Sequence, residues 1–160
     1  MTKGSTVQAA LLAVGIAAIV ATPATADLTR AKKFGELMPK PPAGWRGSKA
    51  YPEFKKQVSA VLVTYTQKGG EGSVNLEIKD VVTKDNKISA HKPKSFGMKA
   101  TMIKGLKAGY EPCTVQPRKV RAYYVITGNY LVKLTCTETK NEIALKLLNA
   151  IDYKAIAAVK

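Results

Sequence analysis

The stretch that decides the fold is RKVRAYYVITGNYLVKLTCT, residues 118–137. It is rich in β-branched and aromatic side chains, which favour strands, and Gly128-Asn129 has the composition of a two-residue hairpin turn. We therefore expect antiparallel strands at 118–127 and 130–137. The turn fixes the register, with Val125 opposite Val132 and Tyr123 opposite Leu134.

A second hairpin is predicted upstream. QVSAVLVTYT (Gln57 to Thr66) reads as a strand with both faces largely buried, and Ser73 to Val82 as its partner. In the partner, apolar Val74, Leu76 and Ile78 alternate with polar residues, which predicts one buried and one solvent-facing side. The turn between the strands contains Gly69, Gly70 and Gly72.

Apolar residues at helical spacing predict three helical segments. Residues 27–40 favour a short helix or an extended lead-in that stops before Pro41-Pro42. Ser95 to Ala108 favours a helix that is weakened by Gly105. Near the C-terminus, Thr139 and Glu142 have the spacing of a capping box, and the helix after them runs to about residue 151. After that helix, Asp152 is expected to begin a second short helix over residues 153–159.

These elements predict an α+β domain, a mostly antiparallel sheet with two main helices packed on it. The two main helices are the segments 95–108 and 140–151. Trp45 stands where the chain enters the sheet. It fits a core or lid residue, and a ligand platform is the alternative.

The N-terminus has the organisation of a secretory signal peptide. Lys3 precedes an uncharged apolar run, residues 9–21, and Ala24-Thr25-Ala26 supplies the small residues of a cleavage site. A membrane-spanning helix needs about 20 apolar residues, so this run suits a signal peptide better than a retained anchor. We expect a cleaved signal at 1–26, one domain at 27–160 without a transmembrane anchor, and a periplasmic or secreted protein.

The chain is strongly basic, with 26 Lys and Arg against 11 Asp and Glu and a net charge of +15. Only Lys3 among these lies before residue 27, so the mature chain carries +14. Such a charge favours anionic partners, although solubility alone is the alternative.

Two cysteines, Cys113 and Cys136, predict a disulfide in an oxidising compartment. Closing this loop would stabilise the fold by about 3 kcal/mol. A metal pair or a reactive thiol fits less well. Residues 110–115 read as a further strand. If it pairs simply with 118–127, the cysteines lie two strands apart, too far for a bond. We therefore expect 110–115 to cross over to the last strand, or else the cysteines are not bonded.

The catalytic inventory is small. The only histidine, His91, lies in a polar segment and fits a solvated surface residue, and Gly69, Gly70 and Gly72 lie between strands, where no helix N-terminus follows to bind phosphate. No nucleophile, metal or nucleotide motif is present in the sequence, so we expect a protein that is not an enzyme and has no cofactor.

Basic residues cluster from 84 to 107, with seven lysines and a single acid, Asp85. A smaller set lies in 118–121. Lysine rather than arginine dominates and few aromatic residues are interleaved, which disfavours nucleic acid as the partner. The alternative is a solvated face. The candidate anion-binding residues are Lys84, Lys87, Lys92, Lys94, Lys99, Lys104, Lys107, Arg118, Lys119 and Arg121.

Four stretches together resemble small exported bacterial proteins of unknown function with a Mog1/PsbP-like α/β sandwich. They are LMPKPPAGW (37–45), VLVTYTQKGGEGSVNLEIKD (61–80), YYVITGNYLVKLTC (123–136) and LLNAIDYKAIAAV (147–159). The likeness covers most of residues 27–160. It implies a non-catalytic binding or accessory role.

The sequence therefore favours a non-enzymatic binding module that docks on an anionic partner, either an acidic protein or the phosphates of an envelope surface. The alternative is a small ligand carrier or enzyme with a pocket between sheet and helices.

Cleavage after Ala26 has a direct readout. The apolar run and the small residues before Asp27 predict that the intact mass of the exported protein begins at Asp27. A mature chain that begins at Met1 or Thr2 would instead show a retained anchor.

Overall fold

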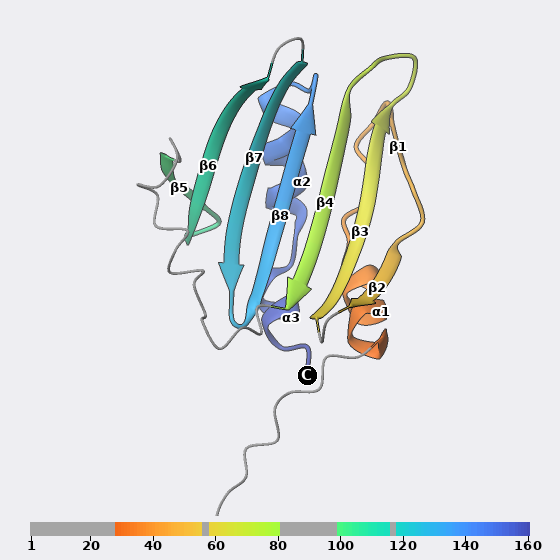
Figure 1. The fold of residues 1–160 in the computed structure, drawn as a ribbon, viewed down its shortest axis with the longest axis vertical. Coiled ribbons are helices and arrows are strands. Elements are labelled where there is room, and N and C mark those ends of the chain that lie inside the picture. Colours follow the sequence, from red (N-terminus) through yellow and green to blue (C-terminus); the bar gives the residue numbers. More distant parts are fainter. Residues whose placement is uncertain (1–27, 56–57, 81–98, 116–117) are drawn as a thin grey trace, which may run out of the picture.

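The computed structural model describes residues 28–55, 58–80, 99–115 and 118–160. These residues form one antiparallel eight-stranded sheet and three helices (Figure 1). In chain order the elements are α1 (Leu28–Glu36), β1 (Trp45–Gly47), β2 (Tyr51–Lys55), β3 (Val58–Gln67), β4 (Ser73–Asp80), β5 (Lys99–Ile103), β6 (Leu106–Val115), β7 (Arg118–Thr127), β8 (Tyr130–Thr137), α2 (Asn141–Ala150) and α3 (Tyr153–Ala157). The predicted α+β class is confirmed.

The two predicted hairpins, β3–β4 and β7–β8, form the centre of the sheet. The register across Gly128-Asn129 is the predicted one, with Val125 opposite Val132. Pairing of β4 with β8 joins the two hairpins and places Leu76 opposite Leu134. The strand order is β1-β3-β4-β8-β7-β6-β5, and β2 also pairs with β3. Two short strands, β1 and β2, thus share the outer edge of β3.

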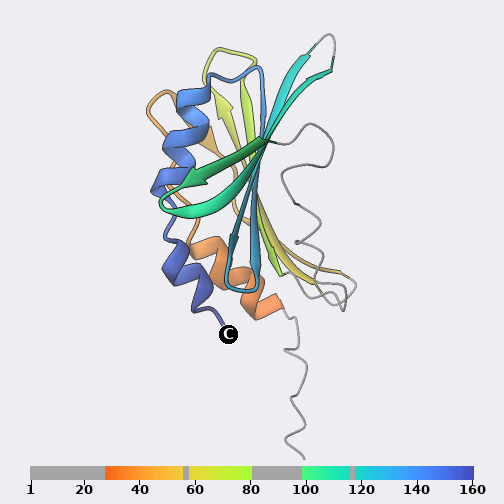
Figure 2. The same cartoon turned by 90° about the vertical axis from the view of Figure 1, so that its left-hand side faces the viewer.

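The helices all lie against one face of the sheet (Figure 2). Because strand side chains alternate between faces, every second residue of the central strands points toward these helices. The largest fully buried side chains are Tyr65, Phe34, Leu76, Ile78, Leu134, Leu147, Leu148, Ile151, Ile156, Val61, Val74 and Val125. They form a single core between sheet and helices. Among the described residues, no helix lies on the opposite face of the sheet, the uncovered face (Figure 2).

A buried ion pair fixes helix α1 to the sheet. Arg30 Nη1 lies 3.1 Å from Asp80 Oδ2 at the end of β4, and both side chains are almost fully buried. The same carboxylate oxygen accepts a hydrogen bond from the backbone N–H of Ser59 on β3, also at 3.1 Å. One turn later in the helix, the Phe34 ring packs edge-on against Tyr130, with the ring centroids 5.0 Å apart. These contacts set the position of the N-terminal helix.

Trp45 is buried at the start of β1, as predicted for a core residue, with 8% of its surface exposed. On the adjacent strand β3, Tyr65 donates a hydrogen bond from its hydroxyl to the Pro39 carbonyl at 2.7 Å. Burial raises the pKa of Tyr65 to about 12. The chain between α1 and β1 is therefore held against the sheet.

The predicted helix at 95–108 is wrong over its described part, since residues 99–103 and 106–108 belong to the β5–β6 hairpin. The reason is the turn at Lys104-Gly105, where both residues adopt positive φ values of 49° and 79°. A right-handed helix cannot contain that conformation, whereas a tight two-residue hairpin turn requires it. The helix that accompanies α2 as a main helix is α1.

The predicted capping box is also wrong. The residue that caps α2 is Lys140, which makes no side-chain capping bond. The Thr139 hydroxyl instead donates hydrogen bonds to two strand carbonyls. The carbonyl of Thr137 lies 2.8 Å away and that of Ser73 lies 3.1 Å away. The predicted restart is confirmed, because the Asp152 carboxylate accepts the backbone N–H of Ala155 at 3.0 Å and begins α3.

The predicted signal peptide, residues 1–26, lies outside the described residues. Within the described ranges, none of the helices has the length and apolar character needed to cross a bilayer.

The change in the free energy of unfolding caused by Gly105→Ala should have opposite signs in a hairpin turn and in a helix. In a helix interior, Gly105→Ala would stabilise the protein by about 1 kcal/mol. In the observed turn the added methyl group meets no neighbour, but φ of 79° is unfavourable for alanine, so the free energy of unfolding should fall by about 1–2 kcal/mol.

Urea unfolding of the two proteins measures this difference. Gly69→Ala is the matched control, because Gly69 has a φ of 70° in an equally open turn. Both variants should lose similar stability, and a stabilised Gly105→Ala protein would contradict the hairpin.

Candidate functional site

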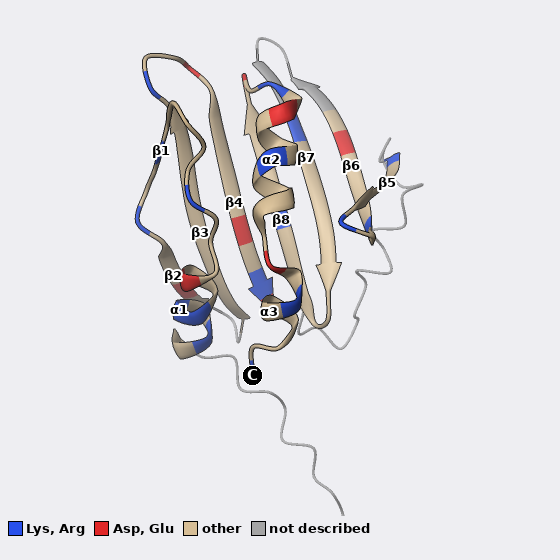
Figure 3. Ribbon diagram, turned by 180° about the vertical axis from the view of Figure 1, so that it is seen from behind, with Lys and Arg blue, Asp and Glu red and all other residues tan. Residues whose placement is uncertain are grey.

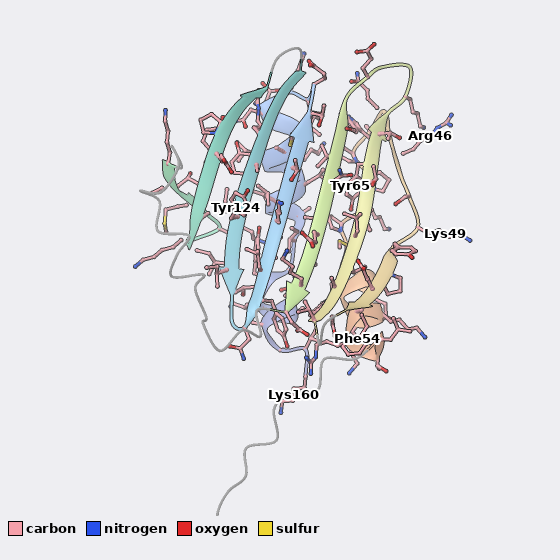
Figure 4. All side chains as sticks on the ribbon, in the orientation of Figure 1. Arg46, Lys49, Phe54, Tyr65, Tyr124 and Lys160 are labelled. Carbon is pink, nitrogen blue, oxygen red and sulfur yellow. The ribbon has the colours of Figure 1, made fainter. Side chains whose placement is uncertain are left out.

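The uncovered face of the sheet presents one continuous row of side chains across five strands. The strand registers place Tyr51, Leu62, Glu77, Lys133 and Tyr124 side by side, from β2 through β3, β4 and β8 to β7. Figure 4 shows the position of Tyr124 on this face. The row begins and ends with an aromatic ring and carries an acid and a base at its centre.

Polar contacts tie this row together. The Tyr124 hydroxyl donates to Glu111 Oε2 at 3.0 Å, and Lys133 Nζ lies 5.8 Å from the centroid of the Tyr124 ring. Glu77 is the cross-strand partner of Lys133 and forms an ion pair with Lys79 at 3.3 Å. Because acids and bases are interleaved, the centre of this face carries little net charge.

A shallow open groove of about 290 Å³ crosses the same face. Tyr51 and Leu62 supply apolar surface, and Asn75, Glu77 and Lys133 supply hydrogen-bonding groups. The remaining lining residues are Glu53, Ala60, Val61 and Thr135. Such a groove can hold a small ligand with one apolar side. Sequence reasoning missed it, although the alternation of Asn75 and Glu77 with buried residues marks the solvent-facing side of β4.

The predicted basic residues fall into separate groups. Lys99, Lys104 and Lys107 lie together on the β5–β6 hairpin, and all three are exposed (Figure 3). Lys104 also has a structural role, because its ammonium donates to the carbonyl of Ile151, at the C-terminal end of α2, at 3.0 Å. Cations are favourable at that end of a helix.

The other predicted anion-binding residues do not join this group in the described structure. Arg121 is half-buried on β7, opposite Cys136 of β8, several residues along the strand from the β5–β6 turn. Arg118 and Lys119 begin β7, but their side chains are not among those that the structure describes. Lys84, Lys87, Lys92 and Lys94, together with His91, lie outside the described residues.

The crossover predicted for residues 110–115 is wrong. They belong to β6, which pairs directly with β7 and places Cys113 opposite Val120. Cys136 lies on β8, at the far side of β7, and its thiol is free and buried. Two strand spacings amount to about 10 Å, whereas the Cα atoms of a disulfide lie about 4.4–6.8 Å apart. The observed register therefore disfavours the predicted bond.

The space between sheet and helices is occupied by the core where α2 and α3 cover it. A recess of about 240 Å³ remains at its rim, between α1 and β2. Ala31, Gly35, Ala50, Pro52 and Val61 line it, and Lys32 and Glu36 flank it. In the part of the chain that the structure describes, no group of three or more His, Cys, Asp or Glu side chains is placed to hold a metal ion.

Three comparisons with known proteins found no match. No family model, no curated protein and no solved structure matches this chain.

The state of the two cysteines is a direct test of the strand register. Burial raises the pKa of the Cys136 thiol to about 12, so in the folded protein at pH 8 this thiol stays neutral and iodoacetamide should not modify it. After unfolding without reductant, both cysteines should be alkylated. This outcome is the opposite of the one that the sequence alone predicts.

Peptide mapping by mass spectrometry under non-reducing conditions provides the measurement. A linked pair of peptides containing Cys113 and Cys136 would contradict the β6–β7–β8 register and support the crossover.

Proposed function

We propose that the protein is a non-enzymatic binding module of the periplasm or the extracellular space that docks on an anionic partner. The partner is an acidic protein or the phosphates of an envelope surface. The observation that carries this proposal is the group of exposed lysines on the β5–β6 hairpin, Lys99, Lys104 and Lys107.

The charge of this hairpin is unbalanced. Its single carboxylate, Glu111, is engaged by the Tyr124 hydroxyl on the uncovered face of the sheet. The lysines therefore add to the field of a chain whose net charge is +15, which attracts anions over distances of about a Debye length, 8 Å at physiological salt. The central row on the same sheet is balanced, so the hairpin is the better anion-docking element.

The architecture is compatible with the proposed kinship to small exported proteins with a Mog1/PsbP-like sandwich. A mostly antiparallel sheet with helices packed on it is the arrangement that the resemblance implies, and the uncovered face leaves a broad surface for a partner. The alternative, a ligand carrier or enzyme with a pocket between sheet and helices, has weaker support, because the larger groove lies on the opposite face.

Charge placement can be separated from total charge with two double variants. Lys99→Gln/Lys107→Gln removes two charges from the hairpin, and Lys32→Gln/Lys33→Gln removes the same charge from exposed positions on α1. Lys104 is left intact because it contacts Ile151. Exposed charges contribute little to folding, so both variants should keep the stability of the parent protein.

The probes are surfaces coated with polyphosphate or with polyglutamate. Each lysine near an anion contributes about 1 kcal/mol in water, so the hairpin variant should bind about 30-fold more weakly at low salt, and the α1 variant much less so. Salt should reduce the association rate more than it changes dissociation. Equal losses in the two variants would show that only net charge matters, and absence of binding to both surfaces would refute the proposal.

A further inference from the structure

The lysine-bearing hairpin also exposes apolar side chains. Met102 on β5 has 59% of its surface exposed and lies opposite Lys107 on β6. The neighbouring residue of Lys107, Ala108, faces the core opposite Val125, so Lys107 and Met102 point to the uncovered side of the sheet. A large apolar side chain thus stands in water beside a lysine.

A second apolar side chain extends the same surface. Ile126 on β7 is 37% exposed and follows Val125, which is the partner of Ala108. It therefore lies on the uncovered side at the end of the β6–β7 pairing, beyond Lys107. The surface thus combines two exposed apolar residues with Lys107 beside them, whereas Lys99, the partner of Tyr110, lies on the helix-covered side of the sheet.

The hairpin is held in a fixed position. Ile103 is buried in the core and Leu106 packs against it on either side of the turn, and Lys104 binds the end of α2. Figure 2 shows the hairpin curling from the edge of the sheet toward the helices. Met102 therefore projects from a rigid support and needs no rearrangement to meet a partner surface.

Resting on the proposed function, we infer that the β5–β6 hairpin docks this protein on the surface of an anionic lipid bilayer. Lys107 faces the lipid phosphates, and Met102 and Ile126 enter the boundary between headgroups and acyl chains. An acidic protein would complement only the lysine. A bilayer complements both kinds of side chain in one plane, because its phosphates lie next to apolar chains.

The two kinds of contact are needed together. A single short apolar insertion holds a protein on a membrane only weakly and reversibly, whereas an apolar contact combined with a basic patch gives stable attachment. Juxtamembrane lysines contribute about 1 kcal/mol each on anionic lipid. Attachment should therefore require anionic lipid and weaken when either contribution is removed.

Vesicle binding by the chain from Asp27 to Lys160 tests this inference. The protein should sediment with vesicles of phosphatidylcholine and phosphatidylglycerol at a ratio of 7:3, and it should not sediment with phosphatidylcholine alone. Lys107→Gln should weaken binding about fivefold, because one lysine contributes about 1 kcal/mol, and Lys99→Gln, on the other side of the hairpin, should weaken it less. Met102→Ser, which leaves the charge unchanged, should weaken it about fivefold, because only part of the side chain leaves water on binding.

Phe54→Ser is the matched control for the apolar contact. Phe54 is exposed to a similar extent as Met102, at 48%, but it lies on β2 at the other edge of the sheet. Its replacement should leave vesicle binding unchanged. Equal losses from Met102→Ser and Phe54→Ser would overturn the assignment to this hairpin.

Fluorescence locates the inserted residue directly. In Met102→Trp, emission should shift to shorter wavelength on vesicles and be quenched by lipids brominated on their acyl chains. The Phe54→Trp protein should show neither effect. The native Trp45 is 8% exposed and gives a constant background in both proteins.

The outcomes separate this inference from the proposed function. Binding to polyphosphate or polyglutamate without binding to the anionic vesicles would overturn the bilayer inference and leave the anion-docking function standing. Vesicle binding that is unaffected by Met102→Ser, with residue 102 unquenched, would also overturn it. Failure to bind all three anionic probes would refute both.

Discussion

The pairing of β4 with β8 is the contact on which the rest of the structure depends. It joins two hairpins that lie far apart in the sequence, and it does so in a register that puts Leu76 beside Leu134 and Ile78 beside Val132. A slip by one residue would turn one whole hydrophobic set toward water. With this register, one side of the sheet is apolar enough to hold the helices. The same register decides that Glu77 and Lys133 meet on the uncovered side.

The N-terminal helix depends on that arrangement in a different way. Its contact with the sheet includes the buried pair of Arg30 and Asp80, and removing one partner from a buried ion pair typically costs about 3–5 kcal/mol. The Asp80 carboxylate also accepts the N–H of Ser59, so it links α1, β3 and β4 at one point. The buried ion pair therefore adds to the packing of Phe34 in fixing where α1 lies.

Sequence patterns identified the elements whose signals are local. The two central hairpins follow from β-branched runs that flank glycine-containing turns, and the last helices follow from apolar spacing and the cap at Asp152. The segment from 99 to 108 misled because Met102, Ile103 and Leu106 fit a helical spacing, while Lys104 at φ of 49° gives no signal in the sequence. The partner of β6 and the face occupied by each lysine depend on long-range register, which single-sequence patterns do not carry.

For the candidate site, too, local sequence signals were sufficient for some features, whereas others depended on long-range strand pairing. The lysines of the β5–β6 hairpin were identified from their density in the sequence. Their separation from Arg121, and the presence of Met102 on the surface rather than in a core, required the three-dimensional pairing of β5, β6 and β7. The groove beside Tyr51 draws its walls from four strands, so no contiguous motif could predict it.

The division of one sheet edge between β1 and β2 has a consequence for self-association. An exposed strand edge is a template on which another chain can add a strand, and long flat edges promote aggregation. Here the edge beside β3 is split into strands of three and five residues, and Pro52 removes one backbone donor from the second. At the opposite edge, β5 is only five residues long and begins with Lys99. Within the described residues, neither outermost strand exceeds five residues, so neither offers a long ladder to a strand of a second copy.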